Sequence, residues 1–75
     1  MVVMHVVVEY ENLKLEFNIE AEDGVSFDDA SENLLEHIYQ RSGKMHVKFF
    51  DPIEKVNRFI DFSGAKSVVV RQQAL

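Results

Sequence analysis

The chain has 75 residues and a formal net charge of −5, and it contains no cysteine. This length allows one small domain, which buries only about 60–65% of the surface that its unfolded chain exposes. Without cysteine, disulfides and cysteine-based metal sites are excluded. No apolar run approaches the roughly 20 residues of a membrane span, and the apolar start MVVMHVVVEY lacks the basic leader and cleavage site of a secretion signal. We therefore expect a cytoplasmic protein with no membrane partner.

The charges are divided unevenly along the chain. Residues 1–43 carry two basic and ten acidic side chains, a net charge of −8, whereas residues 44–75 carry six basic and three acidic ones, a net charge of +3. Such a division can mark a surface for a charged partner. Alternatively, both sets are solvated faces of one small fold.

The first twenty residues predict a β-hairpin. Val2–Tyr10 is apolar in both of its alternating rows, as in a central strand or a strand covered on both sides. Leu13–Glu20 alternates cleanly between apolar and polar residues, which is typical of a strand with one wet face. The polar pair Glu11-Asn12 separates the two runs, and so short a break favours a hairpin.

The clearest helix is predicted over about residues 26–42. Ser26 stands where an N-cap is expected, with Asp29 three residues later as a weak capping box. Gly43 is placed to end the helix in the left-handed conformation. The apolar residues recur at helical spacing on one face, namely Phe27, Ala30, Leu34 and Ile38, with Leu35 beside them.

Three segments follow the helix. Met45–Phe50 predicts a third strand, which Asp51-Pro52 ends because proline cannot donate to a strand ladder. The next segment is ambiguous, since an aspartate cap followed by proline is a good helix start and predicts a second helix at 52–62. Its apolar residues are good strand formers, and we favour a strand at Val56–Phe62. Lys66–Gln72 predicts the last strand.

The fold class is therefore α+β in one domain, residues 1–75, with a single helix packed on one face of a four- or five-stranded sheet. The predicted order is β-β-α-β-β-β, with β-β-α-β-α-β as the alternative. This order of elements, over the whole chain, resembles the β-grasp layout of ubiquitin-like proteins. The chain ends in Gln-Ala-Leu rather than in the Gly-Gly tail of ubiquitin and the sulfur carriers, so we expect neither conjugation nor sulfur transfer.

The residues that could take part in catalysis or ligand binding do not combine into a known motif. None of His5, His37 and His46 has a partner at metal-site spacing. No serine lies in a G-x-S-x-G elbow, and no glycine-rich stretch could cradle a phosphate. One helix on one sheet also leaves little room for a pocket of about 300 Å³. We therefore expect a protein that is not an enzyme and has no cofactor or metal.

The predicted strands carry apolar residues on both faces, and one helix can cover only one of them. The uncovered row is a candidate interface, and self-association as a homodimer is the simplest way to bury it. Phe59 is the preferred central residue, because aromatic side chains dominate such contacts. The candidate interface residues are Val3, Val7, Phe50, Phe59 and Val69.

Two other functions are compatible with the charges. The acidic half could present a nucleic-acid-like surface to a basic protein, and in size and charge the chain resembles the small acidic inhibitors that phages use against host defences. The basic half could instead form a weak nucleic-acid-binding face with aromatic side chains for stacking, although the net negative charge makes nucleic acid the less expected partner. The candidate basic face comprises Lys44, Lys48, Lys55, Arg58, Lys66 and Arg71.

Overall fold

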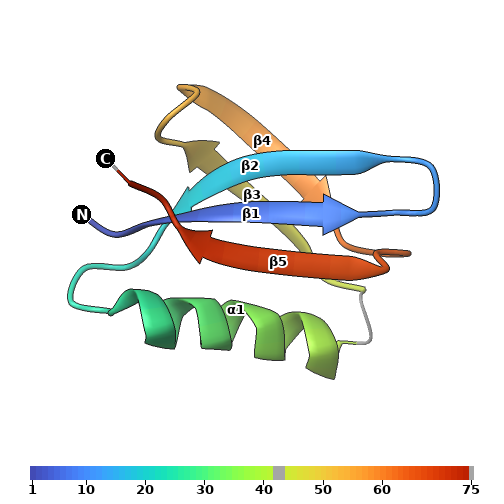
Figure 1. Cartoon of the computed structure of the whole chain (residues 1–75), viewed down its shortest axis with the longest axis horizontal. Helices are drawn as coiled ribbons and strands as arrows, with labels where there is room; N and C mark the ends of the chain where they lie inside the picture. Colours follow the sequence, from blue (N-terminus) through green and yellow to red (C-terminus); the bar gives the residue numbers. More distant parts are fainter. Residues whose placement is uncertain (42–43, 75) are drawn as a thin grey trace.

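The computed structural model describes residues 1–41 and 44–74 (Figure 1). It is an α+β structure with one helix and five strands, in the predicted order β-β-α-β-β-β. The elements are β1 (Val3–Glu9), β2 (Lys14–Glu20), α1 (Phe27–Gln40), β3 (His46–Asp51), β4 (Val56–Asp61) and β5 (Ser67–Gln72). The agreement with the β-grasp layout is one of element order.

The first sheet has three antiparallel strands in the order β2-β1-β5. The predicted hairpin of β1 and β2 is confirmed, and β1 is the central strand, as its valine-rich rows indicated. Val6 lies opposite Phe17 of β2 on one side and opposite Val70 of β5 on the other. One face of this sheet therefore carries an apolar row from each strand.

The remaining two strands form a separate antiparallel sheet, the β3–β4 hairpin. The prediction of a strand rather than a helix at Val56–Phe62 is confirmed, because β4 covers Val56–Asp61. The expectation of a single four- or five-stranded sheet is wrong. A lone helix cannot cover the whole apolar face of three strands, and the hairpin folds over that face to bury the rest.

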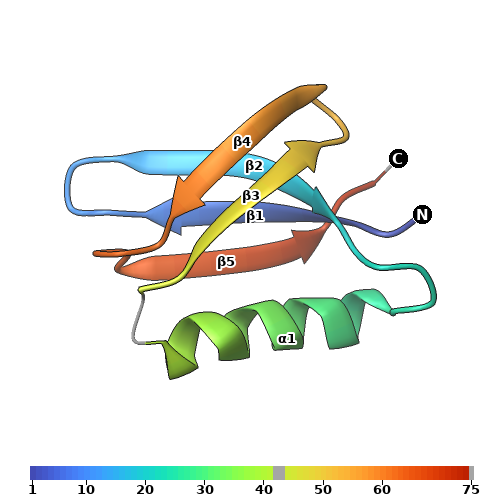
Figure 2. The same ribbon diagram turned by 180° about the vertical axis from the view of Figure 1, so that it is seen from behind.

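The core lies between the three-stranded sheet and a second layer made of α1 and the hairpin. Figure 2 shows β3 and β4 crossing in front of β1 and β2, with α1 alongside β5. Met4, Val6 and Val8 of β1 belong to the same buried cluster as Ile38 of the helix and Ile60 of the hairpin. The ring of Phe17 lies 5.4 Å from that of Phe49 and 6.4 Å from that of Phe62, between centroids.

The helix begins as predicted and turns the predicted face inward. The Asp29 backbone N–H donates to the side-chain oxygen of Ser26 (3.2 Å), which is the expected N-cap. Ala30 and Ile38 are buried against the sheet, whereas Leu35 is partly exposed. The predicted role of Gly43 lies outside the described residues. No helix in residues 1–41 and 44–74 is long and apolar enough to cross a membrane.

We expect Phe17→Ala to cost about 3–5 kcal/mol of unfolding free energy, because it empties a fully buried aromatic site. That is a large part of the roughly 4–11 kcal/mol that a domain of this size possesses. Tyr39→Ala, at a helix position that is 84% exposed, should change stability by less than about 0.5 kcal/mol. Urea denaturation followed by circular dichroism measures both values, and similar values for the two variants would contradict this assignment of the core.

Candidate interaction surface on the β3–β4 hairpin

The hairpin turns one face to the core and the other to solvent. Lys48 lies opposite Phe59, and Phe50 lies opposite Asn57, in the register of the two strands. Successive side chains of a strand alternate between faces, so these residues share the outer face. We call this set the hairpin outer face, and it comprises His46, Lys48, Phe50, Asn57, Phe59 and Asp61.

Two phenylalanines dominate the hairpin outer face. Phe50 is 52% exposed and Phe59 is 55% exposed, although both belong to regular strands. A shallow open depression of about 560 Å³ lies between them, lined by Lys48, Phe49, Phe50, Asn57, Arg58 and Phe59. The ring of Phe59 leans over that of His46, with centroids 5.4 Å apart and planes tilted by 31°. Such a stacked neighbour limits the freedom of the Phe59 ring.

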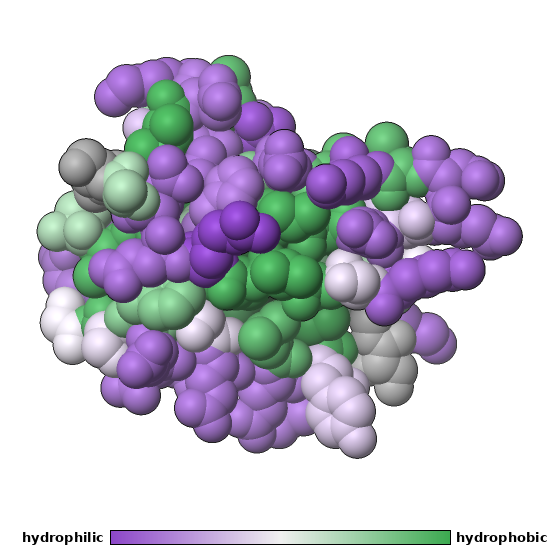
Figure 3. Space-filling view, in the orientation of Figure 1, coloured by the Kyte–Doolittle hydropathy of each residue, from purple (hydrophilic) through white to green (hydrophobic). Residues whose placement is uncertain are grey.

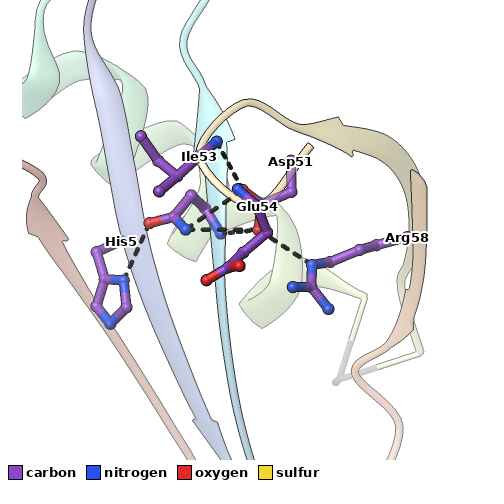
Figure 4. A network of polar contacts seen from close by, with 6 residues as sticks. His5, Asp51, Ile53, Glu54 and Arg58 are labelled. Atoms are coloured by element: carbon purple, nitrogen blue, oxygen red, sulfur yellow. Dashed lines mark hydrogen bonds and ion pairs between the residues drawn. The ribbon is translucent and has the colours of Figure 1, made fainter. Parts of the chain in front are cut away.

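A buried carboxylate holds the hairpin in shape. Asp51, the last residue of β3, is fully buried, and its Oδ1 accepts hydrogen bonds from the backbone N–H groups of Ile53 and Glu54, both at 3.0 Å. Its Oδ2 accepts a bond from Nε of Arg58 on β4, also at 3.0 Å (Figure 4). The carboxylate therefore closes the turn and ties the two strands together.

The same carboxylate fastens the hairpin to the first sheet. The backbone N–H of Asn18 on β2 donates to Asp51 Oδ2 at 3.0 Å, and Nδ2 of Asn18 lies 3.3 Å from Oδ1. Oδ1 of Asn18 in turn lies 3.1 Å from Nδ1 of His5 on the central strand. In the part of the chain that the structure describes, every buried polar side-chain atom has a hydrogen-bond partner.

These contacts govern the ionisation of Asp51. Burial alone would raise the pKa of this carboxyl, but the backbone N–H groups of Glu54 and Asn18, the Arg58 guanidinium and the backbone N–H of Ile53 together lower the pKa to about 2. Asp51 is therefore ionised at neutral pH. It is enclosed and saturated with donors, so it is a structural group that cannot meet a substrate.

The predicted interface residues do not share one face. Val3 and Val7 are only 1% and 7% exposed, so their prediction as contact residues is corrected. They point away from the core, on the outer face of the three-stranded sheet, and Val69 lies opposite Val7 with 45% of its surface exposed. Figure 3 shows this face, with hydrophobic surface at its middle and hydrophilic side chains around it. Long neighbours such as Glu16, opposite Val7, can cover the valines with their aliphatic stems.

Of the five candidates, Phe50 and Phe59 are brought together on the hairpin outer face, and Val69 lies on a different sheet. The six predicted basic residues are likewise dispersed. Lys48 and Lys55 belong to the hairpin, while Arg58 is committed to Asp51. Arg71 lies on the outer face of the other sheet, opposite His5. Lys44 precedes β3, and Lys66 precedes β5.

The sequence did not reveal the bridge from His5 through Asn18 to Asp51. The only signal was the Asp51-Pro52 pair, which predicts a cap, and the cap is present on Ile53 and Glu54. Nothing in the alternation of Leu13–Glu20 distinguishes Asn18 from the charged residues in its row. No group of three or more potential metal ligands occurs among the residues that the structure describes.

A pH prediction follows from the lowered pKa of Asp51. The ordinary pKa of 3.8 applies to the unfolded chain, so the stabilisation by the Asp51 carboxylate is complete above about pH 5 and is lost as the pH falls through 4 towards 2. The difference between the pKa values of the unfolded and folded chain corresponds to about 2–3 kcal/mol of unfolding free energy. Asp51→Asn should unfold more easily at pH 7, by about 3–5 kcal/mol, because it leaves Arg58 without its buried partner.

Urea unfolding at pH 2, 3, 4 and 7 measures this effect. The difference in unfolding free energy between the parent chain and Asp51→Asn should shrink as the pH falls. Asp23→Asn, a change in an exposed loop, serves as the control and should stay within about 0.5 kcal/mol of the parent chain. A difference between the parent chain and Asp51→Asn that stays constant from pH 7 to pH 2 would rule out the role assigned to the carboxylate.

The chain matches no family model, no curated protein and no solved structure. The surfaces and contacts of the described residues are therefore the basis for inferring what the protein does.

Proposed function

We propose that this protein is a small non-enzymatic interaction module that self-associates through the hairpin outer face. The observation that carries the proposal is the pair Phe50 and Phe59, each more than half exposed on a regular two-stranded sheet that α1 does not cover. Large aromatic side chains that remain exposed on a rigid surface are typical anchors of protein interfaces.

The energetics support a contact at this surface. Full burial of a phenylalanine side chain is worth roughly 1.5–3 kcal/mol, and association recovers part of this after its entropic cost. That cost is reduced when the contact surface is rigid beforehand. The hairpin meets this condition, because Asp51 closes its turn and the other face packs into the core through Ile60.

A second copy of the chain is the simplest partner. In a two-fold contact the same surface of each copy meets its counterpart, so the surface must be self-complementary. Apart from His46, the hairpin outer face carries one base, Lys48, and one acid, Asp61. Its charges are therefore nearly balanced, and two copies do not repel one another. On the outer face of the three-stranded sheet, by contrast, Val3 and Val7 are already buried, and Val69 alone of the three candidates there is exposed.

Phe59→Glu should give a folded protein that no longer self-associates, because it introduces a charge at the centre of the surface without touching the core. Sedimentation velocity over a concentration series measures association, and circular dichroism reports folding. Tyr39→Glu, which adds the same charge at an exposed helix position, is the matched control and should associate like the parent chain.

Two results would overturn the proposal. A parent chain that stays monomeric at high micromolar concentration excludes self-association. Equal association of Phe59→Glu and the parent chain would place the contact elsewhere on the molecule.

A second candidate function is weak binding of single-stranded nucleic acid. The observation that favours it is the position of Lys48 directly opposite the exposed Phe59, with Lys55 in the adjacent turn. Aromatic side chains that stack on bases beside cations are the usual elements of such sites. The net charge of −5 opposes it, since affinity depends on neutralising phosphates.

The charge dependence tests this second candidate. If it holds, fluorescence anisotropy with a labelled oligothymidylate should show binding at low salt that weakens steeply as salt is added. Lys48→Glu combined with Lys55→Glu should abolish that binding, whereas Lys44→Glu combined with Lys66→Glu, the same charge change away from the two phenylalanines, should reduce it less. An absence of binding at low salt would eliminate this function.

A further inference from the structure

The outer edge of β4 carries backbone groups that no strand of the described chain pairs. The backbone N–H of Phe62 donates to the carbonyl of Met45, which fixes the alternation of the β3–β4 ladder. In an antiparallel ladder every second residue points its N–H and C=O away from the partner strand. On β4 these residues are Asn57, Phe59 and Asp61, and β4 ends its sheet.

Of the other three sheet edges, those of β5 and β2 are shielded in part, and the remaining edge strand, β3, is in contact with β2. Figures 1 and 2 both show α1 running alongside β5, and the two elements are in contact. On the outer edge of β2, the Asn18 N–H donates to the Asp51 carboxylate. Natural proteins commonly protect edge strands with such covers, because a bare edge pairs with other chains. The stretch of β4 around Asn57 and Phe59 has no equivalent cover within residues 1–41 and 44–74.

We propose that two copies of this chain pair antiparallel through the outer edges of β4, with Arg58 at the two-fold axis, so that both hairpins form one continuous sheet. This inference rests on the proposed self-association, and it places the contact along the β4 edge of the hairpin instead of across the hairpin outer face. The hairpin outer faces of the two copies then lie on the same side of the joined sheet, which brings the exposed phenylalanines of both copies into one surface.

The register follows from which backbone groups are free. At one end of β4 the Tyr10 hydroxyl donates to the Asp61 carbonyl, and at the other the Lys55 N–H donates to the Asp51 carbonyl. The backbone N–H and C=O groups of Asn57 and Phe59 are paired with no strand of the described chain. A symmetric pairing that uses both residues sets Asn57 opposite Phe59 of the second copy. Each such pair exchanges both of its main-chain hydrogen bonds.

The side chains fit the same register. Extending the register one residue beyond β4 sets Lys55, the last residue of the turn, opposite Asp61 of the second copy. The two-fold axis repeats this pair of opposite charges at the other end. At the axis, Arg58 of one copy lies opposite Arg58 of the second copy. Like charges in such a position are normally unfavourable. Here each guanidinium is already held by the buried Asp51 carboxylate at 3.0 Å, so the pair of arginines is neutralised. This reciprocal match favours a second copy over an unrelated strand.

Amide hydrogen exchange tests the pairing directly. The amides of Asn57 and Phe59 should exchange rapidly in dilute protein and become protected as the concentration rises. Where nine-tenths of the chains are paired, exchange should slow by about tenfold, because it proceeds through the open monomer. The Glu16 amide, which points away from β1 on the β2 edge, is the control and should not change with concentration.

A charge exchange tests the register. Lys55→Glu alone and Asp61→Lys alone should each lose self-association, since each homodimer then sets like charges opposite one another at both ends. An equimolar mixture of the two variants should recover dimers, because both ends of the mixed dimer carry opposite charges. Lys66→Glu, on an exposed lysine outside the hairpin, is the control and should associate like the parent chain.

The outcomes separate this inference from the proposed function. A dimer that depends on Phe59 while the Asn57 and Phe59 amides exchange as in the monomer would support the face contact and overturn the edge pairing. If the Asn57 and Phe59 amides become protected but the equimolar mixture of the charge variants forms no dimer, the register centred on Arg58 is overturned. A monomeric parent chain would overturn both proposals together.

Discussion

The carboxylate of Asp51 is the contact on which the arrangement of the molecule depends. It is fully buried and accepts bonds from the turn that follows it, from the adjacent β4 and from β2, which lies far away in the sequence. A buried charge is costly unless donors surround it, and removing one partner leaves the others unsatisfied. The angle at which the hairpin crosses the first sheet is therefore fixed by polar bonds at the sheet edge as well as by the apolar core beneath it.

The division into two sheets determines which aromatic residues are buried. Because the hairpin folds over the apolar face of the first sheet, Phe49 meets Phe17 in the core, whereas its neighbour Phe50 must point to solvent. In a single flat sheet with one helix, an entire face of five strands would have remained uncovered. The actual arrangement places both exposed phenylalanines, Phe50 and Phe59, on the small hairpin.

The elements could be predicted from sequence, because each depends on local periodicity and caps. The helix is an example, with Ser26 and the face of Ala30 and Ile38 both as expected. The association of the strands depends on contacts between distant residues, which periodicity does not encode. Asp51-Pro52-Ile53-Glu54 indeed begins as a helix does, with the aspartate capping two N–H groups. Lys55, with a positive φ of 61°, then leaves the helical path, and β4 gains its ladder with β3 instead.

The interface prediction failed at Val3 and Val7 for a related reason. Counting apolar residues on a face assumes that only another element can cover them, yet long polar neighbours on adjacent strands can do so within one sheet. Phe50 and Phe59 differ, because a two-stranded sheet supplies few neighbours for so large a side chain. In the pairing that we propose, the bond that Arg58 donates to Asp51 then links fold and assembly. It closes the hairpin, and it neutralises the charge that would otherwise repel a second β4 at its free edge.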